Sequence, residues 1–456
     1  MLLEQFLLLM LGWRPAFAQE RTLMRLVSLV LGLLCSSARK TLSSAIIFKS
    51  GAATWAADYF VFSRSKWSLT TVFDSVFRAS VKQLDELAPD EPVVVLLDDT
   101  SLKKSSRRIQ QAQWLRDPLG PPFHVNLKYG LRCLHMALRL PLHKLGFAAR
   151  AISILFELAP SAKKPGRRAT DEERAAFPKL QKKMSLCARA VLAMQLQRNR
   201  LNALGMAARK LLVIVDGGFT NSTVLRSRPD GVEVLGRTRK DIALCLPAEP
   251  GSRRTYGKRL PTPEQMRLDP TIPYQTTVVH YGGKFREVRY KEVVNVLWQG
   301  GARRQLLRLF IIAPTPYRAP GKGNRKLAYG EPAYLICTDL ELSTDFLLQC
   351  YFDRWQIEPV HRDLKTGLGL GQAQAWSSKA VPRIHGLIVA AWSTLVLASL
   401  KAFGPARTAD FAPLPPWRKV KPNHRASQND LIQLLRMDVE AVGNKIELPV
   451  PRLEAA

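Results

Sequence analysis

The sequence has few cysteines, and none stands in a pattern that builds a zinc site or a disulfide framework. The six are widely spaced, and no two form a Cys-x-x-Cys pair, which argues against a zinc ribbon. The seven histidines show neither HExxH nor HxxxH spacing. Scattered cysteines without a framework are typical of a reducing compartment, so we expect a cytoplasmic protein.

Acidic residues are scarce relative to basic ones. The chain has 37 Asp and Glu against 68 Lys and Arg, a formal net charge of +31. An excess of this size favours a polyanionic partner, because each phosphate that a cation neutralises releases a counterion. A ribosomal or chromatin-like binding protein would carry the same excess, so charge alone does not indicate catalysis.

Apolar runs long enough to span a membrane are lacking. The longest, Leu387 to Leu400, has 14 residues and is more typical of a buried helix. The N-terminus has an apolar stretch from Phe6 to Gly12, yet no Lys or Arg precedes it and Glu4 does, which argues against a signal peptide. We expect neither secretion nor a membrane partner.

The sequence contains enough apolar residues, 46% of 456, to form hydrophobic cores, and its length predicts about three domains. Residues 225–334 stand out because short β-rich runs alternate with Pro/Gly turns and carry 21 basic against 9 acidic residues. The predicted organisation is a helical, candidate DNA-binding domain at 1–88, the first part of a catalytic core at 89–224, a basic β-rich insertion at 225–334, the second part of the core at 335–404, and a basic tail with a short helix at 405–456.

Two predicted strands each end in aspartate. Val93 to Leu97 is a continuous β-branched and aliphatic run followed by Asp98 and Asp99, and Leu211 to Val215 is followed by Asp216. Carboxylates at the carboxyl ends of neighbouring strands can converge above a sheet. An Asp at a strand end is also a common turn residue, so each of these alone is a weak signal.

The segment from Tyr351 to Lys365 carries the strongest signal in the chain. At about 100° per residue, Tyr351, Arg354, Glu358, His361 and Lys365 fall on one face of an α-helix. A solvated ion-pair face is the simpler interpretation of such spacing. Pro359 follows Glu358 directly, and a proline inside a helix removes one hydrogen bond, so we expect a kink there.

Together the three acidic positions suggest a metal-dependent enzyme that acts on nucleic acid. Carboxylate oxygens are ligands that suit Mg²⁺ or Mn²⁺ rather than zinc. Two such ions can activate a water and stabilise the leaving oxygen of a phosphodiester. Arg354 and Lys365 would hold the strand by its phosphates.

Tyr351, Arg354, Glu358 and Lys365 match the Y-(2)-R-(3)-E-(6)-K signature, and the chain therefore resembles the DDE transposases of the insertion-sequence-four superfamily. Asp98 to Thr100 is similar to the first acidic motif of that family, and Val215 to Asn221 to the second. The resemblance covers roughly residues 90–400 and includes a β-rich insertion between the second and third acids.

The resemblance implies an α/β fold with a ribonuclease-H-like mixed sheet, the insertion and an N-terminal helical domain. It also implies cut-and-paste transposition with two Mg²⁺ ions, Mn²⁺ being able to substitute. The partners would be double-stranded DNA, both transposon ends and target, and a second subunit in a homodimer.

Carried over by position, the resemblance makes Asp98, Asp216 and Glu358 the catalytic, metal-binding triad. Tyr351, Arg354 and Lys365 would grip the DNA end. His361 and Trp355 could contact bases or phosphate, although Trp355 could equally be a packing residue. Trp298, in the insertion, is a weaker candidate for stacking on an unpaired base. The choice between Asp98 and Asp99 stays open, with the Asp-x-Thr pattern favouring Asp98.

Two other functions remain compatible with the sequence. One is a catalytically inactive, transposase-derived DNA-binding protein, which would bind DNA without metal-dependent strand breakage. The other is a related nuclease that cuts but does not join strands. Strand-transfer products would distinguish the nuclease from a transposase.

Overall fold

The computed structural model describes all residues except 50–54, 118–119, 122–125, 319–326, 418–423 and 444–456. The protein is mixed α/β, and its strands form a twelve-stranded sheet with parallel and antiparallel pairs, plus one two-stranded ribbon. The chain divides into two compact units. Unit 1 comprises residues 1–91, 99–162 and 356–456, and unit 2 comprises residues 92–98 and 163–355. These bounds cross the domain bounds predicted from the sequence.

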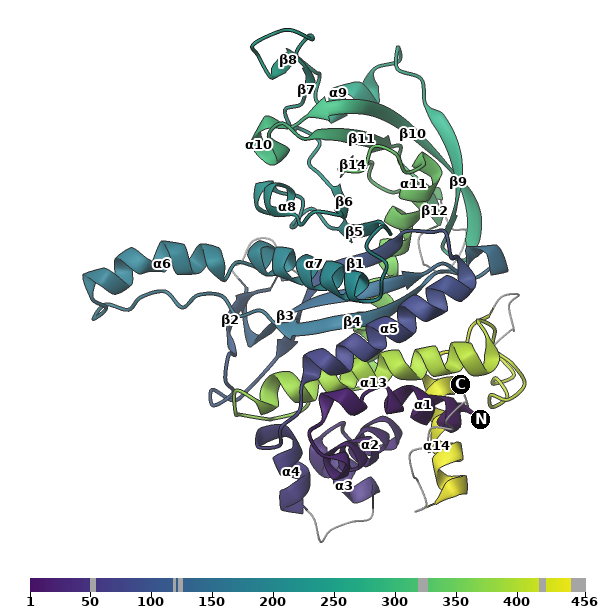
Figure 1. The fold of residues 1–456 in the computed structure, drawn as a ribbon. Coiled ribbons are helices and arrows are strands. Elements are labelled where there is room, and N and C mark those ends of the chain that lie inside the picture. The colour runs from purple at the N-terminus through teal and green to yellow at the C-terminus, as the bar shows by residue number, and fades with distance from the viewer. Residues whose placement is uncertain (50–54, 118–119, 122–125, 319–326, 418–423, 444–456) are drawn as a thin grey trace. The chain divides into compact units, whose positions relative to one another are not determined.

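Unit 1 is built mainly from helices that pack on a β-hairpin. The long apolar helix α13 contacts α1, α5 and β4, and α5 also contacts β3 (Figure 1). Its elements are α1 (Leu2–Leu11), η1 (Arg14–Ala16), α2 (Glu20–Cys35), α3 (Leu42–Phe48), α4 (Trp55–Ser63), α5 (Leu69–Leu87), the second part of β1 (Val93–Lys103), β2 (Gln113–Arg116), β3 (Leu127–Leu140), η3 (His143–Leu145), β4 (Arg150–Leu158), α12 (Ile357–Arg362), η5 (Asp363–Gly367), α13 (Ala380–Phe403) and α14 (Gln428–Val442).

The helix α13 confirms the prediction of a buried helix over the longest apolar run. It is long and apolar enough to cross a membrane by composition, but 78% of its most apolar window is buried inside the protein. The apolar N-terminal segment likewise forms a packed helix, α1, whose Leu2, Phe6 and Met10 are buried. Both segments serve as core helices of unit 1.

Unit 2 is dominated by strands. In its part of the sheet β1, β5 and β6 are parallel neighbours, and antiparallel strands follow in the order β14, β11 and β10. Its elements are the first part of β1, α6 (Asp171–Lys183), α7 (Leu186–Ala203), β5 (Leu211–Val215), α8 (Ser222–Ser227), β6 (Val232–Arg237), β7 (Cys245–Pro247), β8 (Tyr256–Arg259), α9 (Pro263–Leu268), β9 (Gln275–Tyr281), β10 (Lys284–Leu297), α10 (Gln299–Ala302), β11 (Leu306–Ile312), β12 (Pro316–Arg318), β13 (Leu327–Tyr329), β14 (Ala333–Cys337), α11 (Thr344–Asp353) and the start of η4 (Arg354–Gln356).

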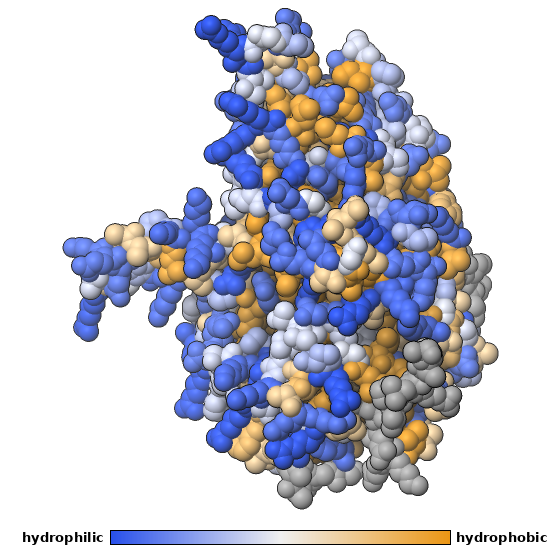
Figure 2. Space-filling view, in the orientation of Figure 1, coloured by the Kyte–Doolittle hydropathy of each residue, from blue (hydrophilic) through white to orange (hydrophobic). Residues whose placement is uncertain are grey.

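The helical pattern from Thr170 to Leu204, which opens with a capping-box sequence, predicts one helix, but the structure has two. Thr170 and Glu173 form the capping box at the start of α6, which ends at Lys183. A second helix, α7, then begins after Ser185, whose side chain caps it. None of the residues of α6 is buried, and Figure 2 shows mostly hydrophilic side chains along it.

Candidate active site

Asp98 and Asp216 lie on neighbouring parallel strands of unit 2. The register of β1 and β5 pairs Val93 with Leu211 and continues to Leu96 with Ile214. Two residues further along each strand stand Asp98 and Asp216. Neighbouring strands lie about 4.8 Å apart, so the two carboxylates emerge from adjacent positions. Both side chains are half-buried.

The prediction that the first strand ends at Asp98 is wrong. β1 continues to Lys103 because its second half has β3 as a neighbour, and the backbone N–H of Lys104 donates to the Tyr129 carbonyl at 2.9 Å. β5 does end at Val215. β1 therefore extends beyond the end of its parallel partner β5, and Asp98 lies within the strand.

The turn after β5 holds Asp216 in a fixed position. Its Oδ1 accepts hydrogen bonds from the backbone N–H groups of Gly218 at 3.0 Å and Phe219 at 3.3 Å. The Thr220 hydroxyl donates to the Asp216 carbonyl at 2.9 Å. The Asn221 side chain then caps α8 by accepting hydrogen bonds from the backbone N–H groups of Thr223 and Val224. Within the described residues Oδ2 accepts no hydrogen bond, so one carboxylate oxygen keeps its acceptor capacity.

A basic residue that the sequence analysis missed stands at the end of β6. β6 pairs in parallel with β5, so Arg237 leaves the sheet at the same edge as Asp216. Gly236, just before it, is tightly packed: a Cβ there would lie 2.1 Å from Thr220 Oγ1 and 2.6 Å from Val215 Cγ2. The clue was the alternating segment Val232 to Leu235, which follows a short helix and so completes a strand–helix–strand unit.

A cavity of about 580 Å³ lies beside the Asp216 turn, entirely within unit 2. Gly217 and Asn221 from the turn line it together with Arg237, Arg239 and Trp298. The structure thus brings the predicted Trp298 to the neighbourhood of the second acid. Arg226 of α8 fixes that position by donating to three carbonyls of the helical turn after Trp298, at 2.7 to 3.1 Å.

The segment predicted as one helix is interrupted. It runs through α11, the 3₁₀ turn η4, α12 and the π-helical turn η5, so the prediction of one regular α-helical face is wrong. In the interior of a regular α-helix, the backbone N–H of residue 359 would donate to the carbonyl of Trp355, but Pro359 has no backbone N–H. The break at η4 lies at that carbonyl. Pro359 itself falls in the first turn of α12, where an N–H has no helical partner anyway.

The interruption divides the predicted site residues between the two units. Tyr351, Arg354 and Trp355 belong to unit 2, and Glu358, His361 and Lys365 to unit 1. The pKa of the Tyr351 phenol is raised, because the effect of burial outweighs the opposite effect of the nearby cations Arg237 and Arg354. Trp355 is 54% exposed in η4. Glu358 is half-buried in α12, and Lys365 is exposed in η5.

Asp99 is engaged in unit 1. Arg132 of β3 donates its Nε–H to Asp99 Oδ2 at 2.8 Å, and both side chains are partly exposed. The next residue back, Asp98, belongs to unit 2 with Asp216. Because the side chains of consecutive strand residues point to opposite faces, only one of these aspartates can share a face with a given neighbour. Asp98 aligns with Asp216 in the strand register, whereas Asp99 pairs with Arg132, so the two aspartates have different surroundings.

His361 has a partner that the sequence analysis did not anticipate. Its Nε2 and Nδ1 of His135 on β3 share a hydrogen bond of 2.8 Å. Burial, and secondarily the charge of Lys365, lower the pKa of His361 to about 4. Burial also lowers the pKa of His135 well below its usual range. Both rings are therefore neutral at physiological pH, so His361 brings no positive charge to a phosphate.

The donor set at the two strand ends fits a hard divalent cation. Asp98 and Asp216 supply carboxylate oxygens, which Mg²⁺ and Mn²⁺ prefer. In the described parts of the chain, no three His, Cys, Asp or Glu side chains gather in one group that could hold a metal ion. To hold such a cation, the two aspartates of unit 2 would need at least one further oxygen ligand.

Comparisons with known proteins add no family to this geometry: no family model matches the chain, and no curated protein matches it.

Proposed function

We propose that this protein is a DNA transposase that moves a DNA segment by cut-and-paste chemistry. The observation that carries the proposal is the placement of Asp98 and Asp216 side by side on two parallel strands, next to a cavity lined by Arg237 and Trp298. The tyrosine, arginine, glutamate and lysine signature from Tyr351 to Lys365 supports the same function. The proposed core of the mixed sheet is ribonuclease-H-like, and the proposed assembly on DNA is a homodimer.

In this proposal Asp98, Asp216 and Glu358 hold two Mg²⁺ ions. Bound there, the ions would activate water or a 3′-hydroxyl and stabilise the leaving oxygen of the phosphodiester. The Asp216 turn contributes rigidity, because Oδ1 is fixed by two backbone N–H groups and Oδ2 remains available. Rigid ligands hold a reacting group in one geometry, which is a large part of catalytic power.

The basic and aromatic residues of the site have positioning roles in this proposal. Arg354 and Lys365 bind phosphates near the cleaved bond, and Arg237 adds a third cation that the structure supplies beside Asp216. The Tyr351 phenol donates a hydrogen bond to the same strand. Trp298, at the wall of its cavity, stacks on a base that leaves the duplex at the cut end. Trp355 offers an exposed ring for a further base contact.

The test incubates the purified protein with DNA carrying the flanks of its own gene, with and without Mg²⁺, and resolves the products on a denaturing gel. The expected result is metal-dependent cleavage at a fixed end, followed by joined products when a target plasmid is added. Glu358→Gln, run in parallel, controls for contaminating nuclease. Binding without cleavage would instead indicate an inactive transposase-derived binding protein, and cleavage without joining would indicate a nuclease.

The exposed helix α6 gives a quantitative prediction for DNA binding. Lys179, Lys182 and Lys183 are exposed on it and have no ion-pair partner among the described residues. Changing all three to alanine should weaken binding to duplex DNA of any sequence. The slope of log affinity against log salt should fall by about 2 to 3, since each lost phosphate contact lowers it by about 0.9.

The control for α6 removes the same charge elsewhere. Lys82, Lys144 and Lys401 are also exposed, and their triple alanine variant lowers the net charge equally. If the two triple variants bind with the same salt slope, only overall charge matters and α6 has no specific part in binding. Fluorescence anisotropy with a labelled duplex at several salt concentrations supplies the measurement.

A further inference from the structure

Two exposed tryptophans of unit 1 each lie against an arginine, and the two arginines are adjacent in the sequence. The Arg107 guanidinium is 5.2 Å from the ring of Trp114 and 5.0 Å from that of Tyr129. The Arg108 guanidinium is 5.5 Å from the ring of Trp376. Trp114 is 54% exposed and Trp376 is 52% exposed. These large rings are therefore not core residues, and their free faces are available to a ligand.

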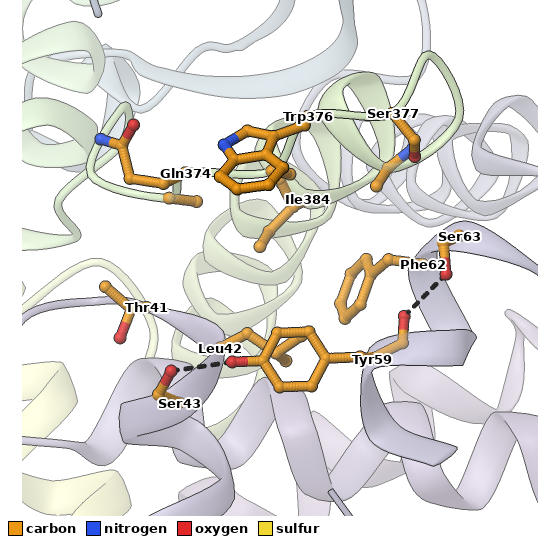
Figure 3. Close-up of a pocket in the computed structure, with 13 residues that line it drawn as sticks. Thr41, Leu42, Ser43, Tyr59, Phe62, Ser63, Gln374, Trp376, Ser377 and Ile384 are labelled. Carbon is orange, nitrogen blue, oxygen red and sulfur yellow. Dashed lines mark hydrogen bonds between the residues drawn. The ribbon is translucent and has the colours of Figure 1, made fainter. Parts of the chain in front are cut away.

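Trp376 also forms one wall of a cavity of about 590 Å³. Figure 3 shows its ring on one side of the cavity, with Tyr59 and Phe62 of α4 on the other. The Tyr59 hydroxyl shares a hydrogen bond of 2.9 Å with the Ser43 hydroxyl, which fixes the position of that ring. Small-molecule sites commonly have volumes of about 300 to 1,000 Å³ and aromatic walls, so this cavity has the size and lining of a ligand site.

The segment that carries Trp376 is held in place by a buried lysine. The Lys104 ammonium donates to the carbonyls of Gly371 at 2.6 Å and Ala373 at 2.7 Å, and to His385 Nε2 at 3.0 Å. The backbone N–H of Gln110 donates to the Trp376 carbonyl at 3.2 Å. The loop with the two arginines and the segment with the tryptophan are thus fixed to each other, and the surface exists before any ligand arrives.

We propose that these residues form a binding path for an unpaired DNA strand, with one base in the cavity. One base would stack on Trp114 and another on Trp376. The next base would enter the cavity between Trp376 and Tyr59. Arg107 and Arg108 would neutralise the phosphates between the stacked bases. This site is separate from the Trp298 cavity of unit 2. The inference rests on the proposed function only in taking nucleic acid as the ligand.

The chemistry favours a single strand over other occupants. A duplex keeps its bases stacked on one another and cannot place them on exposed aromatic rings. An unpaired strand gains affinity for each base that stacks on an aromatic side chain. An apolar molecule would gain nothing from the adjacent Arg107 and Arg108. An acidic peptide would pair with the arginines but would leave the rings uncovered.

The test measures binding to a labelled twelve-nucleotide oligothymidylate and to a matched duplex, both in EDTA so that no strand is cut. Trp376→Ala is expected to raise the dissociation constant for the single strand about tenfold, the effect of one stacked base, and that for the duplex less than twofold. Tyr59→Ala should behave similarly, and Tyr59→Phe should restore binding because the ring is kept. Trp417→Ala removes another exposed tryptophan, 83% exposed, and should change neither constant.

The arginines have their own readout. Changing Arg107 and Arg108 to alanine together should lower the salt slope of single-strand binding by about 1.4, since each contact with a single strand contributes about 0.7. Urea unfolding of each variant checks that the fold is intact. A folded Trp376→Ala protein with unchanged single-strand affinity, or with equal losses on both DNAs, would overturn the proposal.

Two further outcomes separate this inference from the proposed function. A wild-type protein that cleaves duplex ends but does not bind the single strand would contradict the strand path and support the proposed transposase. A protein that binds the single strand through Trp376 but cleaves no DNA would support the strand path and contradict the proposed transposase. Thymidine monophosphate as a competitor distinguishes a free nucleotide from a strand. Equal binding of monophosphate and oligonucleotide would show a nucleotide pocket and overturn the strand path.

Discussion

Asparagine in place of Asp216 is expected to lower metal-dependent DNA cleavage at least about a thousandfold, equivalent to about 4 kcal/mol of transition-state stabilisation. The substitution removes the negative charge that would bind the proposed cation, but it keeps the size and one carbonyl oxygen of the side chain. That oxygen can still accept from the N–H groups of Gly218 and Phe219, so the turn after β5 should keep its shape. Binding to duplex DNA should therefore change less than about threefold.

A matched pair of variants at the first acid decides between two neighbouring aspartates. Asp98→Asn should abolish cleavage as Asp216→Asn does. Asp99→Asn should retain it, because Asp99 pairs with Arg132 in unit 1. The loss of that partly exposed ion pair should lower the free energy of unfolding by less than about 1 kcal/mol.

Single-turnover cleavage on a denaturing gel, with urea unfolding beside it, measures both quantities. An inactive Asp99→Asn beside an active Asp98→Asn would reassign the first acid. Full activity in all three aspartate variants would remove the metal site from these strands altogether. Glu358→Gln completes the set and tests whether Glu358 is the third proposed ligand.

Much of the sheet was predictable because its strands are locally encoded. The prediction of a strand from Leu211 to Val215 is confirmed residue for residue by β5. β5 is a short apolar run buried on both faces, which leaves no competing periodicity. The β-rich run Leu306 to Ile312 also predicts a strand, and β11 has those bounds. β1 runs further than predicted because its polar second half is stabilised by β3, a partner about thirty residues away that no local pattern reveals.

The broken helix shows where local rules reach their limit. The proline rule correctly warned of an irregularity near Pro359, but the break falls earlier, at the carbonyl that loses its donor. The prediction that Tyr351, Arg354 and Glu358 share one face assumed one ideal α-helix. The 3₁₀ turn η4 and the π-helical turn η5 change the rotation about the helix axis per residue. Spacing alone therefore identified the residues of the signature but not their arrangement.

The residues that the sequence analysis missed are those whose role depends on packing. Arg237 stands at the edge with Asp216 only because β6 pairs in parallel with β5. His135 becomes the partner of His361 only because α12 packs near β3, although 226 positions separate the two in the chain. Neither residue belongs to a motif, so a single sequence gives no reason to choose them among the other basic residues and histidines.

Buried neutral histidines predict a stability that falls steeply in acid. Burial lowers the pKa of His385 to about 3, and burial lowers that of His361 to about 4. In the unfolded chain both should titrate near 6.5. Below pH 6.5 the unfolded chain therefore binds protons that the folded protein does not, and acid favours unfolding. From pH 7 to pH 5 the free energy of unfolding should fall by about 2 kcal/mol for each of these two histidines, and the lowered pKa of His135 should add to the decrease. Urea unfolding at the two pH values measures it.

The pair of His385 and Lys104 provides the control that isolates one histidine. The ammonium can only donate, so His385 Nε2 accepts from it, and Nδ1 carries the proton that is donated to the Val381 carbonyl at 2.6 Å. His385→Leu alone should destabilise the protein by about 1 to 3 kcal/mol, since it leaves a buried ammonium one bond short.

Lys104→Met combined with His385→Leu removes both partners of this hydrogen bond, but it leaves the carbonyls of Gly371 and Ala373 without their lysine donor. The double variant should therefore stay less stable than the wild type at pH 7. It should lose only the part of the decrease between pH 7 and pH 5 that His385 contributes, about 2 kcal/mol, because His361 and His135 still resist protonation. An unchanged pH dependence in the double variant would show that His385 is protonated without penalty, and that the acid sensitivity has another source.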